Sequence, residues 1–304
     1  MAERSEATCR HLTGPYHLPP QSVVVVPQRQ VVTLRALRLL PSRPMDLRLT
    51  HVGTATLLLE LGGLRLLTDP ALDPAGRDYR FAPCVGSRKT EAPALPPGGL
   101  GRLDAALVSH DHHADNLDAA GRELLRTVPR VLTTRPGARR LGPPAVGLAP
   151  WETHELTGPD GARATITATP ARHGPAGITL VDSVTIGFLI AHEGLRAPVW
   201  ISGDTVWFSG IAEVARRCAP VGVAVVHVGD VGFTATGPAR FTFDGAQAAR
   251  AAKAVGAATI VPVHYSGWSH FRQGRAEADA AFAAAGLAER VRWLPRGEPI
   301  TLSV

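Results

Sequence analysis

The sequence predicts an α/β (α+β) fold in which two sheet-and-helix halves pack into one domain. Three observations carry this prediction: strand-like runs outnumber helical ones, hairpins come early in each half, and helices are appended after them. The halves cover about 45–177 and 178–304. With 304 residues, 45% of them apolar and 19% charged, the chain has the composition of a globular protein with a sizeable core.

Residues 1–44 differ in composition from the rest of the chain. They mix Pro, Gln, Ser, Arg and Val without sustained periodicity, so we expect a disordered or poorly ordered N-terminal extension, with Met45 as a hypothetical natural start. The segment holds six of the 32 basic and two of the 26 acidic residues, which leaves 26 basic and 24 acidic residues in the remaining 260. A nucleic-acid-binding surface concentrates positive charge on the folded domain. Nucleic acid is therefore not an expected partner, despite the net charge of +6.

The first half begins with a hairpin pattern around Gly62-Gly63. Residues 70–102 are rich in Pro and Gly and contain no clear element, so we expect a long surface loop, with Arg77, Tyr79 and Arg80 as a candidate lid over the substrate. Asp118 can cap a helix that runs through Arg126. Apolar and alternating runs predict strands at 46–51, 56–60, 64–69, 105–109, 131–134 and 164–168, and a helical piece at 138–140.

The second half repeats this mixture. Alternating or apolar runs predict strands at 183–192, 199–202, 221–228, 259–263 and 291–294, the last being the final strand. Helical patterns cover 210–218, 243–255 and 276–285. No apolar run approaches the roughly 20 residues that a membrane-spanning helix needs.

The most unusual stretch comes directly after the strand at 105–109. Residues 110–118 hold three of the chain's twelve histidines and three aspartates. Imidazoles and carboxylates crowded together desolvate badly, and a divalent metal ion supplies the positive charge that makes such crowding favourable. A polar turn with incidental histidines is the alternative. Three more candidate ligands, His173, Asp204 and His264, also stand where an apolar strand ends and a Gly- or Pro-containing loop begins.

Several stretches together resemble the metallo-β-lactamase fold superfamily from Met45 onward, most closely its branch with L-ascorbate-6-phosphate lactonase and N-acyl-phosphatidylethanolamine phospholipase D. The stretches are 50–56, 67–70, 109–118, 170–173, 202–205 and 262–265. The resemblance implies an αββα sandwich of two mixed β-sheets flanked by helices, with one or two metal ions, usually zinc. His173 would then belong to the first metal site, Asp204 would bridge, and His264 would belong to the second site.

The histidine cluster departs from the family's H-x-H-x-D-H pattern. His113 and Asp115 keep the family's spacing, and His110 leaves the strand where the first histidine should. Asp111 and His112 remain alternative ligands. Asn116 stands where the pattern has its last histidine and is a poor zinc ligand, so the second ion would be weak, absent, or not zinc (Mn²⁺ or Fe²⁺ instead).

The resulting functional hypothesis is a metal-dependent hydrolase of a phosphodiester, lactone, ester or amide bond in a small molecule or lipid. Asp115 would hold or deprotonate the attacking water, and His270 would protonate a leaving group. Tyr265, Trp268 and His270 would line the cleft, and Arg240 and His227 would meet an anionic part of the substrate. The alternatives are a metal-dependent nuclease and a non-catalytic binding protein on a degenerate site. Cys9, Cys84 and Cys218 form no C-x-x-C pair, which favours the cytoplasm, and a homo-oligomer is left open.

Overall fold

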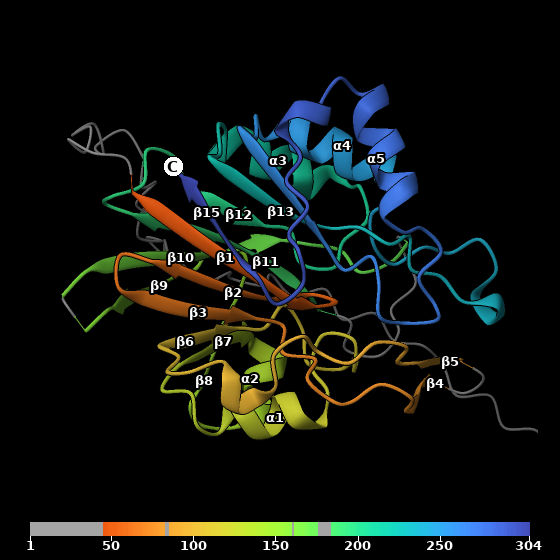
Figure 1. Cartoon of the computed structure of the whole chain (residues 1–304), viewed down its shortest axis with the longest axis horizontal. Helices are drawn as coiled ribbons and strands as arrows, with labels where there is room; N and C mark the ends of the chain where they lie inside the picture. The colour runs from red at the N-terminus through yellow and green to blue at the C-terminus, as the bar shows by residue number, and fades with distance from the viewer. Residues whose placement is uncertain (1–44, 83–84, 160, 176–183) are drawn as a thin grey trace, which may run out of the picture. The chain divides into compact units, whose positions relative to one another are not determined.

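The computed structural model describes residues 45–82, 85–159, 161–175 and 184–304. The predicted extension at 1–44, with Cys9, and also Cys84 lie outside these residues. Cys218 is buried and unpaired. Within 45–304, two large mixed sheets stack face to face with helices on both outer faces (Figure 1). The predicted αββα sandwich is therefore confirmed.

The first sheet has the strand order β15-β1-β2-β3-β6-β7-β8. Its antiparallel part consists of β15, β1, β2 and β3, and it contains the predicted hairpin as β2 and β3, which are joined by the turn at Gly62-Gly63. The parallel strands β6, β7 and β8 continue from β3. The bounds are β1 Asp46–Gly53, β2 Thr56–Leu61, β3 Leu64–Thr68, β6 Ala105–Leu107, β7 Val131–Thr134, β8 Ala145–Leu148 and β15 Pro299–Ser303.

The second sheet has the order β14-β13-β12-β11-β10-β9. Strands β9 to β12 are antiparallel neighbours, whereas β12, β13 and β14 run parallel. The bounds are β9 Thr153–Thr157, β10 Arg163–Pro170, β11 Ile186–His192, β12 Val199–Ile201, β13 Val223–His227 and β14 Thr259–Val263.

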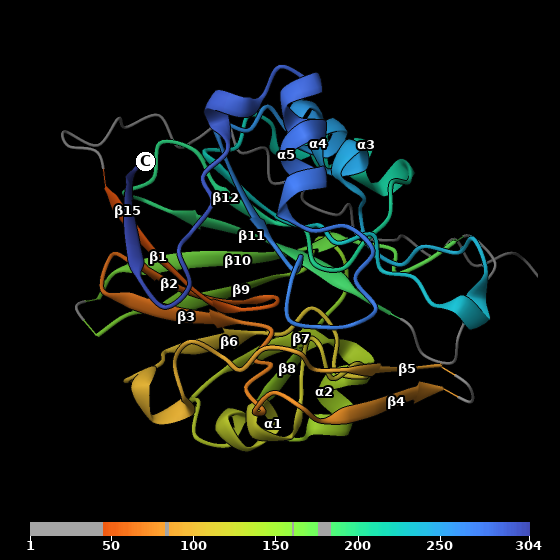
Figure 2. The ribbon, with the colours of Figure 1, turned by 45° about the vertical axis from the view of Figure 1, so that its right-hand side comes forward.

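Alternating side chains explain the layers. Along β2, Leu57 and Leu59 point into the core between the sheets, while Leu58 joins the cluster beneath helix α1 (Ala119–Leu125). Along β13, Val225 faces the other sheet and Val226 faces the helices α3 (Ser209–Cys218), α4 (Gly245–Ala254) and α5 (Arg275–Ala284). Each sheet is thus apolar on both faces and needs a helix layer, as Figure 2 shows.

The helices begin where the sequence places a capping side chain. The Asp118 carboxylate accepts from the backbone N–H of Gly121, which confirms the predicted cap of α1. Thr134 caps α2 (Arg135–Leu141) in the same way, and Asp244 caps α4. No helix in the described ranges is long and apolar enough to cross a membrane.

Two expectations about elements were wrong, and two strands were missed. The segment 70–102 is not a plain loop, since it contains the hairpin β4 (Asp78–Ala82) and β5 (Val85–Arg88) and the 3-10 turn η2 (Pro97–Gly99). Residues 291–294 make only an isolated bridge from Val291 to Ile260, because the final strand is β15, which pairs with β1. Strands β8 and β9 were not predicted: Gly and Pro residues around them mask the short runs.

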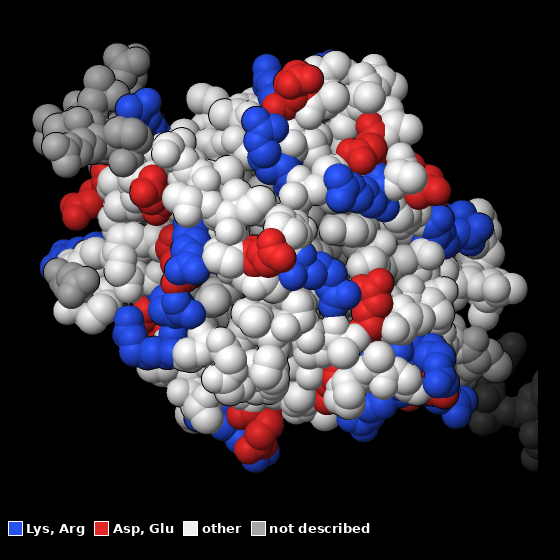
Figure 3. Space-filling model, viewed as in Figure 1, with Lys and Arg blue, Asp and Glu red and all other residues white. Residues whose placement is uncertain are grey.

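The division into two halves near residue 177 falls in the undescribed residues 176–183 and stays a prediction. The sheets do not follow it strictly, because β9 and β10 of the first half pair into the second sheet and β15 returns to the first. On the face drawn in Figure 3, acidic and basic side chains are interspersed.

Candidate metal centre

The predicted ligands come from the ends of four strands and meet in space. Ligand atoms of three groups lie within 4.8 Å of one another: His110, His112 and His113; His110, His173 and Asp204; Asp115, Asp204 and His264. The loops after β6, β10, β12 and β14 supply them. All six predicted metal ligands, and the alternative His112, are therefore brought together.

Three imidazoles converge in the first part of the cluster. His113 Nδ1 lies 3.3 Å from His110 Nε2 and 2.9 Å from His173 Nε2. The other ring nitrogen of His173, Nδ1, is 2.7 Å from the Phe241 carbonyl and donates to it, which leaves Nε2 with its lone pair. His110 Nδ1 is likewise engaged, 3.0 Å from Ser109 Oγ. These outer contacts aim lone pairs at a common point, as metal-binding histidines require.

The two alternative ligands behave differently. Both ring nitrogens of His112 are buried and lack a hydrogen-bond partner, and its ring centroid is 4.3 Å from that of His113. Burial and nearby His173 lower the pKa of His112 to about 4, which keeps it neutral. The Asp111 carboxylate instead faces Arg140, whose Nε is 2.8 Å from Oδ2. The structure thus keeps His112 as a candidate ligand and gives Asp111 another partner.

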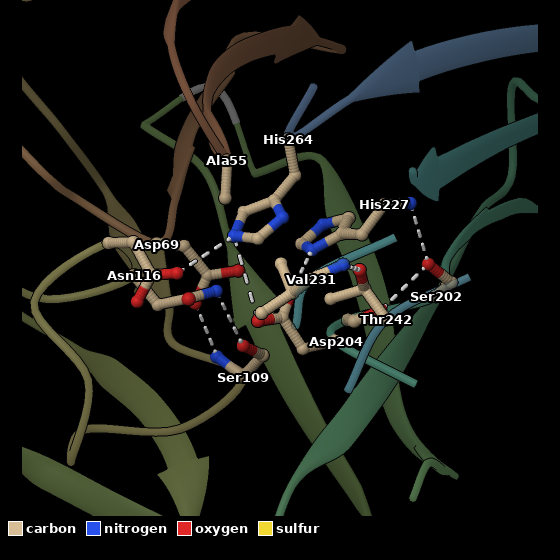
Figure 4. A network of polar contacts seen from close by, with 12 residues as sticks. Ala55, Asp69, Ser109, Asn116, Ser202, Asp204, His227, Val231, Thr242 and His264 are labelled. Carbon is tan, nitrogen blue, oxygen red and sulfur yellow. Dashed lines mark hydrogen bonds and ion pairs between the residues drawn. The ribbon is translucent and has the colours of Figure 1, made fainter. Parts of the chain in front are cut away.

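The second part of the cluster is acidic. His264 Nε2 lies 3.3 Å from Asp115 Oδ2 and 3.6 Å from Asp204 Oδ2. Figure 4 shows the His264 ring between Asp69 and Asp204, with the His227 ring beside it. His264 has a φ of +61°, a conformation that turns its ring inward at the end of β14 and that non-glycine residues rarely adopt. Asp204 belongs to two of the three ligand groups, as a bridging carboxylate would.

The protonation of these groups follows from their contacts. Burial raises the pKa of Asp115, but hydrogen bonds from His264 and His270 outweigh it and hold this pKa well below its usual value. Asp204 is also held anionic, because His264 and His227 lower its pKa more than burial raises it. Burial alone lowers the pKa of His264, yet the two carboxylates raise it overall. The cluster therefore has two carboxylates held ionised in a fully buried place.

Buried polar atoms without partners test whether a metal ion fits. Asp115 Oδ1, Asp204 Oδ2 and His264 Nδ1 are all buried and unpartnered. Such orphaned atoms are costly unless something absent from the polypeptide satisfies them. Imidazole and carboxylate ligands at this density suit zinc, iron or manganese, so the residues fit a divalent ion.

His227 has a role that the sequence did not reveal. It was expected near the substrate, but it is fully buried on β13 and its Nδ1 lies 2.9 Å from Asp204 Oδ1. It therefore positions the shared carboxylate. The signal in the sequence is weak: His227 ends an apolar strand, as the ligands do.

Asp69 was also missed, although it lies in one of the stretches that supported the family resemblance. Its Oδ1 accepts from the backbone N–H of Ser109 at 2.7 Å and so holds the strand end from which His110 leaves. Burial, followed by the charge of Asp204, raises its pKa well above the usual value despite the hydrogen bond from Ser109. Asn116 is fully buried beside this pair, with Nδ2 3.4 Å from Ser109 Oγ and Oδ1 unpartnered.

His270 contacts the cluster directly. Its Nε2 is 3.0 Å from Asp115 Oδ2, and its Nδ1 contacts Ser87 Oγ on β5. Both ring nitrogens therefore have partners, and the arrangement fits the orientation of Asp115 better than the predicted protonation of a leaving group.

The three predicted substrate-binding residues lie in different surroundings. Trp268 is buried, and its ring centroid lies 5.9 Å from that of His270. Tyr265 packs against Trp293, 4.8 Å between centroids. Arg240 Nε pairs with Asp230 Oδ1 at 3.0 Å. Trp268 thus contacts His270, the residue that orients Asp115, and substrate binding by all three stays a prediction.

A cavity of about 250 Å³ opens beside the histidines. Tyr79, Arg80 and Phe81 of β4 line one side, and the histidine loop and the start of α1 line the other through Asp111, His112, His113, Ala114, Leu117, Asp118, Ala119 and Arg122. The predicted lid residues Tyr79 and Arg80 therefore do face a cavity, but from a strand, whereas Arg77 pairs with Asp73.

Comparison with known proteins agrees with this geometry. The family model described as the beta-lactamase superfamily domain matches residues 64–265. A Methanosphaerula palustris protein named as a metal-dependent hydrolase is 28% identical over 77% of this chain and 89% of its own. The N-acyl-phosphatidylethanolamine-hydrolyzing phospholipase D 1 of Caenorhabditis elegans is 33% identical over 37% of this chain, but the match spans only 28% of that enzyme.

Solved structures share the fold. An isothiocyanate hydrolase from Delia radicum gut bacteria superposes with a TM-score of 0.69, at 23% identity, over 84% of this chain and all of its own. A metallo hydrolase from Ignicoccus hospitalis gives a TM-score of 0.63 at 21% identity, over 85% of this chain and 99% of its own. At these identities the likeness concerns the fold alone.

Proposed function

Because the chain belongs to the beta-lactamase superfamily domain family, we propose that it is a metal-dependent hydrolase that cleaves a phosphodiester, lactone, ester or amide bond. The observation that carries the proposal is the convergence of the two ligand groups on the shared Asp204. The name of the Methanosphaerula palustris relative supports it. We propose zinc as the ion, with Mn²⁺ and Fe²⁺ as alternatives, since the ligands are imidazole and carboxylate groups.

The proposed ligands divide into two sets that share one carboxylate. His110, His113 and His173 would hold one ion with Asp204, and Asp115 and His264 would hold a second ion with the same carboxylate. A bound divalent ion would lower the pKa of the water that it binds, so that more hydroxide is present at neutral pH, and would polarise the scissile bond.

The chain's own residues would position the attacking water. Asp115 is held ionised, and its Oδ1 is unpartnered, so it would accept a hydrogen bond from the attacking water and hold that water in place. His270 holds the other oxygen of Asp115 through Nε2 and is itself fixed by Ser87. His227 keeps Asp204 in place from the opposite side. The buried surroundings exclude bulk water from these contacts, which strengthens them.

Metal content of the purified protein tests the proposal. We expect near-stoichiometric metal by mass spectrometry in the wild type, and its loss in His173→Ala and Asp204→Ala. His192→Ala is the matched control, because His192 is buried but lies outside the cluster. Metal-dependent hydrolysis of model diesters and lactones should follow the metal content. A wild type that stays metal-free after reconstitution with excess zinc and manganese would exclude the hydrolase.

The same experiment decides the register of the cluster. Since His113 Nδ1 contacts both His110 and His173, we expect His113→Ala to lose metal and His112→Ala to keep it. The opposite result would make His112 the ligand.

A non-catalytic binding protein is the second candidate, favoured by Asn116 at the place of a ligand. Its signature would be bound metal without hydrolysis of any model substrate.

We further propose a cytoplasmic location from the cysteine usage. We also propose a homo-oligomer, which light scattering of the purified protein tests.

A further inference from the structure

We propose that the cavity beside His113 takes a neutral small molecule with a flat apolar group next to the scissile bond, so that the substrate is an ester, lactone or amide and not a phosphodiester. This inference rests on the proposed hydrolase function and narrows its substrate class.

The size and position of the cavity are the first argument. It measures about 250 Å³, at or below the small end of the roughly 300–1,000 Å³ usual for ligand pockets. Tyr79 and Phe81 stand on one wall, and His113, a proposed ligand, stands on the other. A bound group would therefore lie between aromatic rings and the proposed ligand His113, with room for a small group within the cavity.

Aromatic rings, on the cavity wall and beyond it, surround the candidate metal centre. The ring centroid of Phe81 lies 5.2 Å from that of His113 and 5.5 Å from that of His270. Phe233 stacks on His270 with ring centroids 5.0 Å apart and nearly parallel planes. The ring centroid of Phe241 lies 5.7 Å from that of His173, and the ring centroid of Phe271 lies 4.5 Å from that of His264. Half of the chain's eight phenylalanines thus touch histidines of one small cluster. Such a collar favours flat apolar groups over charged ones.

The charges around the cavity are the second argument. Its lining contains two arginines, Arg80 and Arg122, and two aspartates, Asp111 and Asp118. The arginines are exposed, so water screens them, whereas both aspartates are buried. Arg122 donates to the backbone carbonyl of Asp111.

The cations near the buried aspartates already have carboxylate partners. Arg140 pairs with Asp111, and Lys89 Nζ is 2.9 Å from Asp118 Oδ2. The proposed metal ions would attract a phosphodiester and polarise an ester alike, so the discrimination depends on the side chains; beyond the ions, recognition of a phosphodiester favours a buried arginine or lysine directed at its oxygens. Within the described cavity lining, no buried cation is present. A neutral acyl compound needs none.

The test uses substrates with the same leaving group and different charge. The zinc- or manganese-loaded wild type is given p-nitrophenyl acetate and bis(p-nitrophenyl) phosphate, and the rate of Asp204→Ala is subtracted from each. We expect metal-dependent hydrolysis of the ester. Its kcat/KM, divided by the rate constant of the uncatalysed reaction, should be at least about tenfold higher than the same ratio for the diester. Phe81→Ala should raise KM for p-nitrophenyl benzoate about tenfold with little change in kcat, whereas Phe208→Ala, a phenylalanine outside the cavity lining, should not.

A binding measurement separates this inference from the proposed function. Benzamide should bind the wild type in isothermal titration calorimetry, with or without chelator, and should bind Phe81→Ala at least about tenfold more weakly. Benzamide binding without any hydrolysis would reject the hydrolase and keep the neutral-ligand cavity. Preferential hydrolysis of the diester would reject the inference and keep the hydrolase. Absence of benzamide binding would also reject the inference.

Discussion

The Lys89–Asp118 pair predicts a large effect from a single substitution. Lys89 is 1% exposed at the end of β5, and its ammonium donates to Asp118 Oδ2 at 2.9 Å and to the Ala71 carbonyl at 2.8 Å. It also lies 5.7 Å from the centre of the Trp268 ring. Because burial lowers the pKa of Lys89, these contacts must keep the ammonium charged. Lys89→Met removes all of them and leaves the Asp118 charge buried.

The expected loss of stability depends on the hydrogen bonds that Asp118 keeps in the variant. Removing one partner of a buried ion pair costs about 3–5 kcal/mol. Asp118 retains the backbone donors of Asp73, at 2.6 Å, and Gly121, at 2.9 Å, so we expect the lower end, about 3 kcal/mol. For a domain of this size that corresponds to a fall in melting temperature of about 6–12 °C.

Urea unfolding of chelator-treated protein measures the effect without a contribution from metal binding. The matched control is Lys253→Met, the chain's only other lysine, whose side chain is exposed and donates to the Ala285 carbonyl; we expect it to cost less than about 0.5 kcal/mol. A Lys89→Met protein as stable as Lys253→Met would refute the reasoning. Asp118→Asn added to Lys89→Met should recover part of the loss, since it removes the buried charge.

Two further predictions concern buried histidines. His227→Phe removes the hydrogen bond to Asp204, so chelator competition should show about 10–100-fold weaker metal binding, and His227→Gln should lose less; unchanged affinity in His227→Phe would deny it the positioning role. Burial lowers the pKa of His51 from 6.5 to about 4, so the unfolded chain binds more protons between these values and stability falls as the pH falls through this window. Between pH 7 and pH 4.5, the free energy of unfolding of metal-free His51→Gln, measured with urea, should therefore fall by about 2.5 kcal/mol less than that of the wild type. Equal falls in the two proteins would contradict a neutral His51.

The sequence was sufficient to predict which candidate ligands lie close together, because their surroundings repeat. Each of His110, His173, Asp204 and His264 follows a short apolar strand, and parallel or neighbouring strands bring such ends to one place. The layers were expected from the family resemblance, and the run 105–109, apolar on both faces, agrees with them because it needs cover on both sides.

Other features could not be read from the chain because they depend on long-range contacts. Residues Ser87 and Lys89 belong to a segment that looked like a loop, yet they contact His270 and Asp118. The Asp78–Ala82 strand has no sheet beyond its own hairpin, so its pattern is short and weak. His227 looked like another strand-end residue, and only its packing against Asp204 distinguishes a supporting residue from a ligand.

Strand β15 has a consequence for how the chain is made. Its residues 299–303 pair with residues 46–50 of β1, so the first sheet is completed by segments about 250 positions apart. During synthesis the hairpin β1–β2 leaves the ribosome long before its last neighbour, and one edge of β1 stays unpaired in the meantime. Exposed strand edges can pair with other chains, and contacts this distant in sequence form slowly. The nascent chain is therefore most prone to aggregate until residues 299–303 are released, and chaperone binding should concentrate on that unpaired edge.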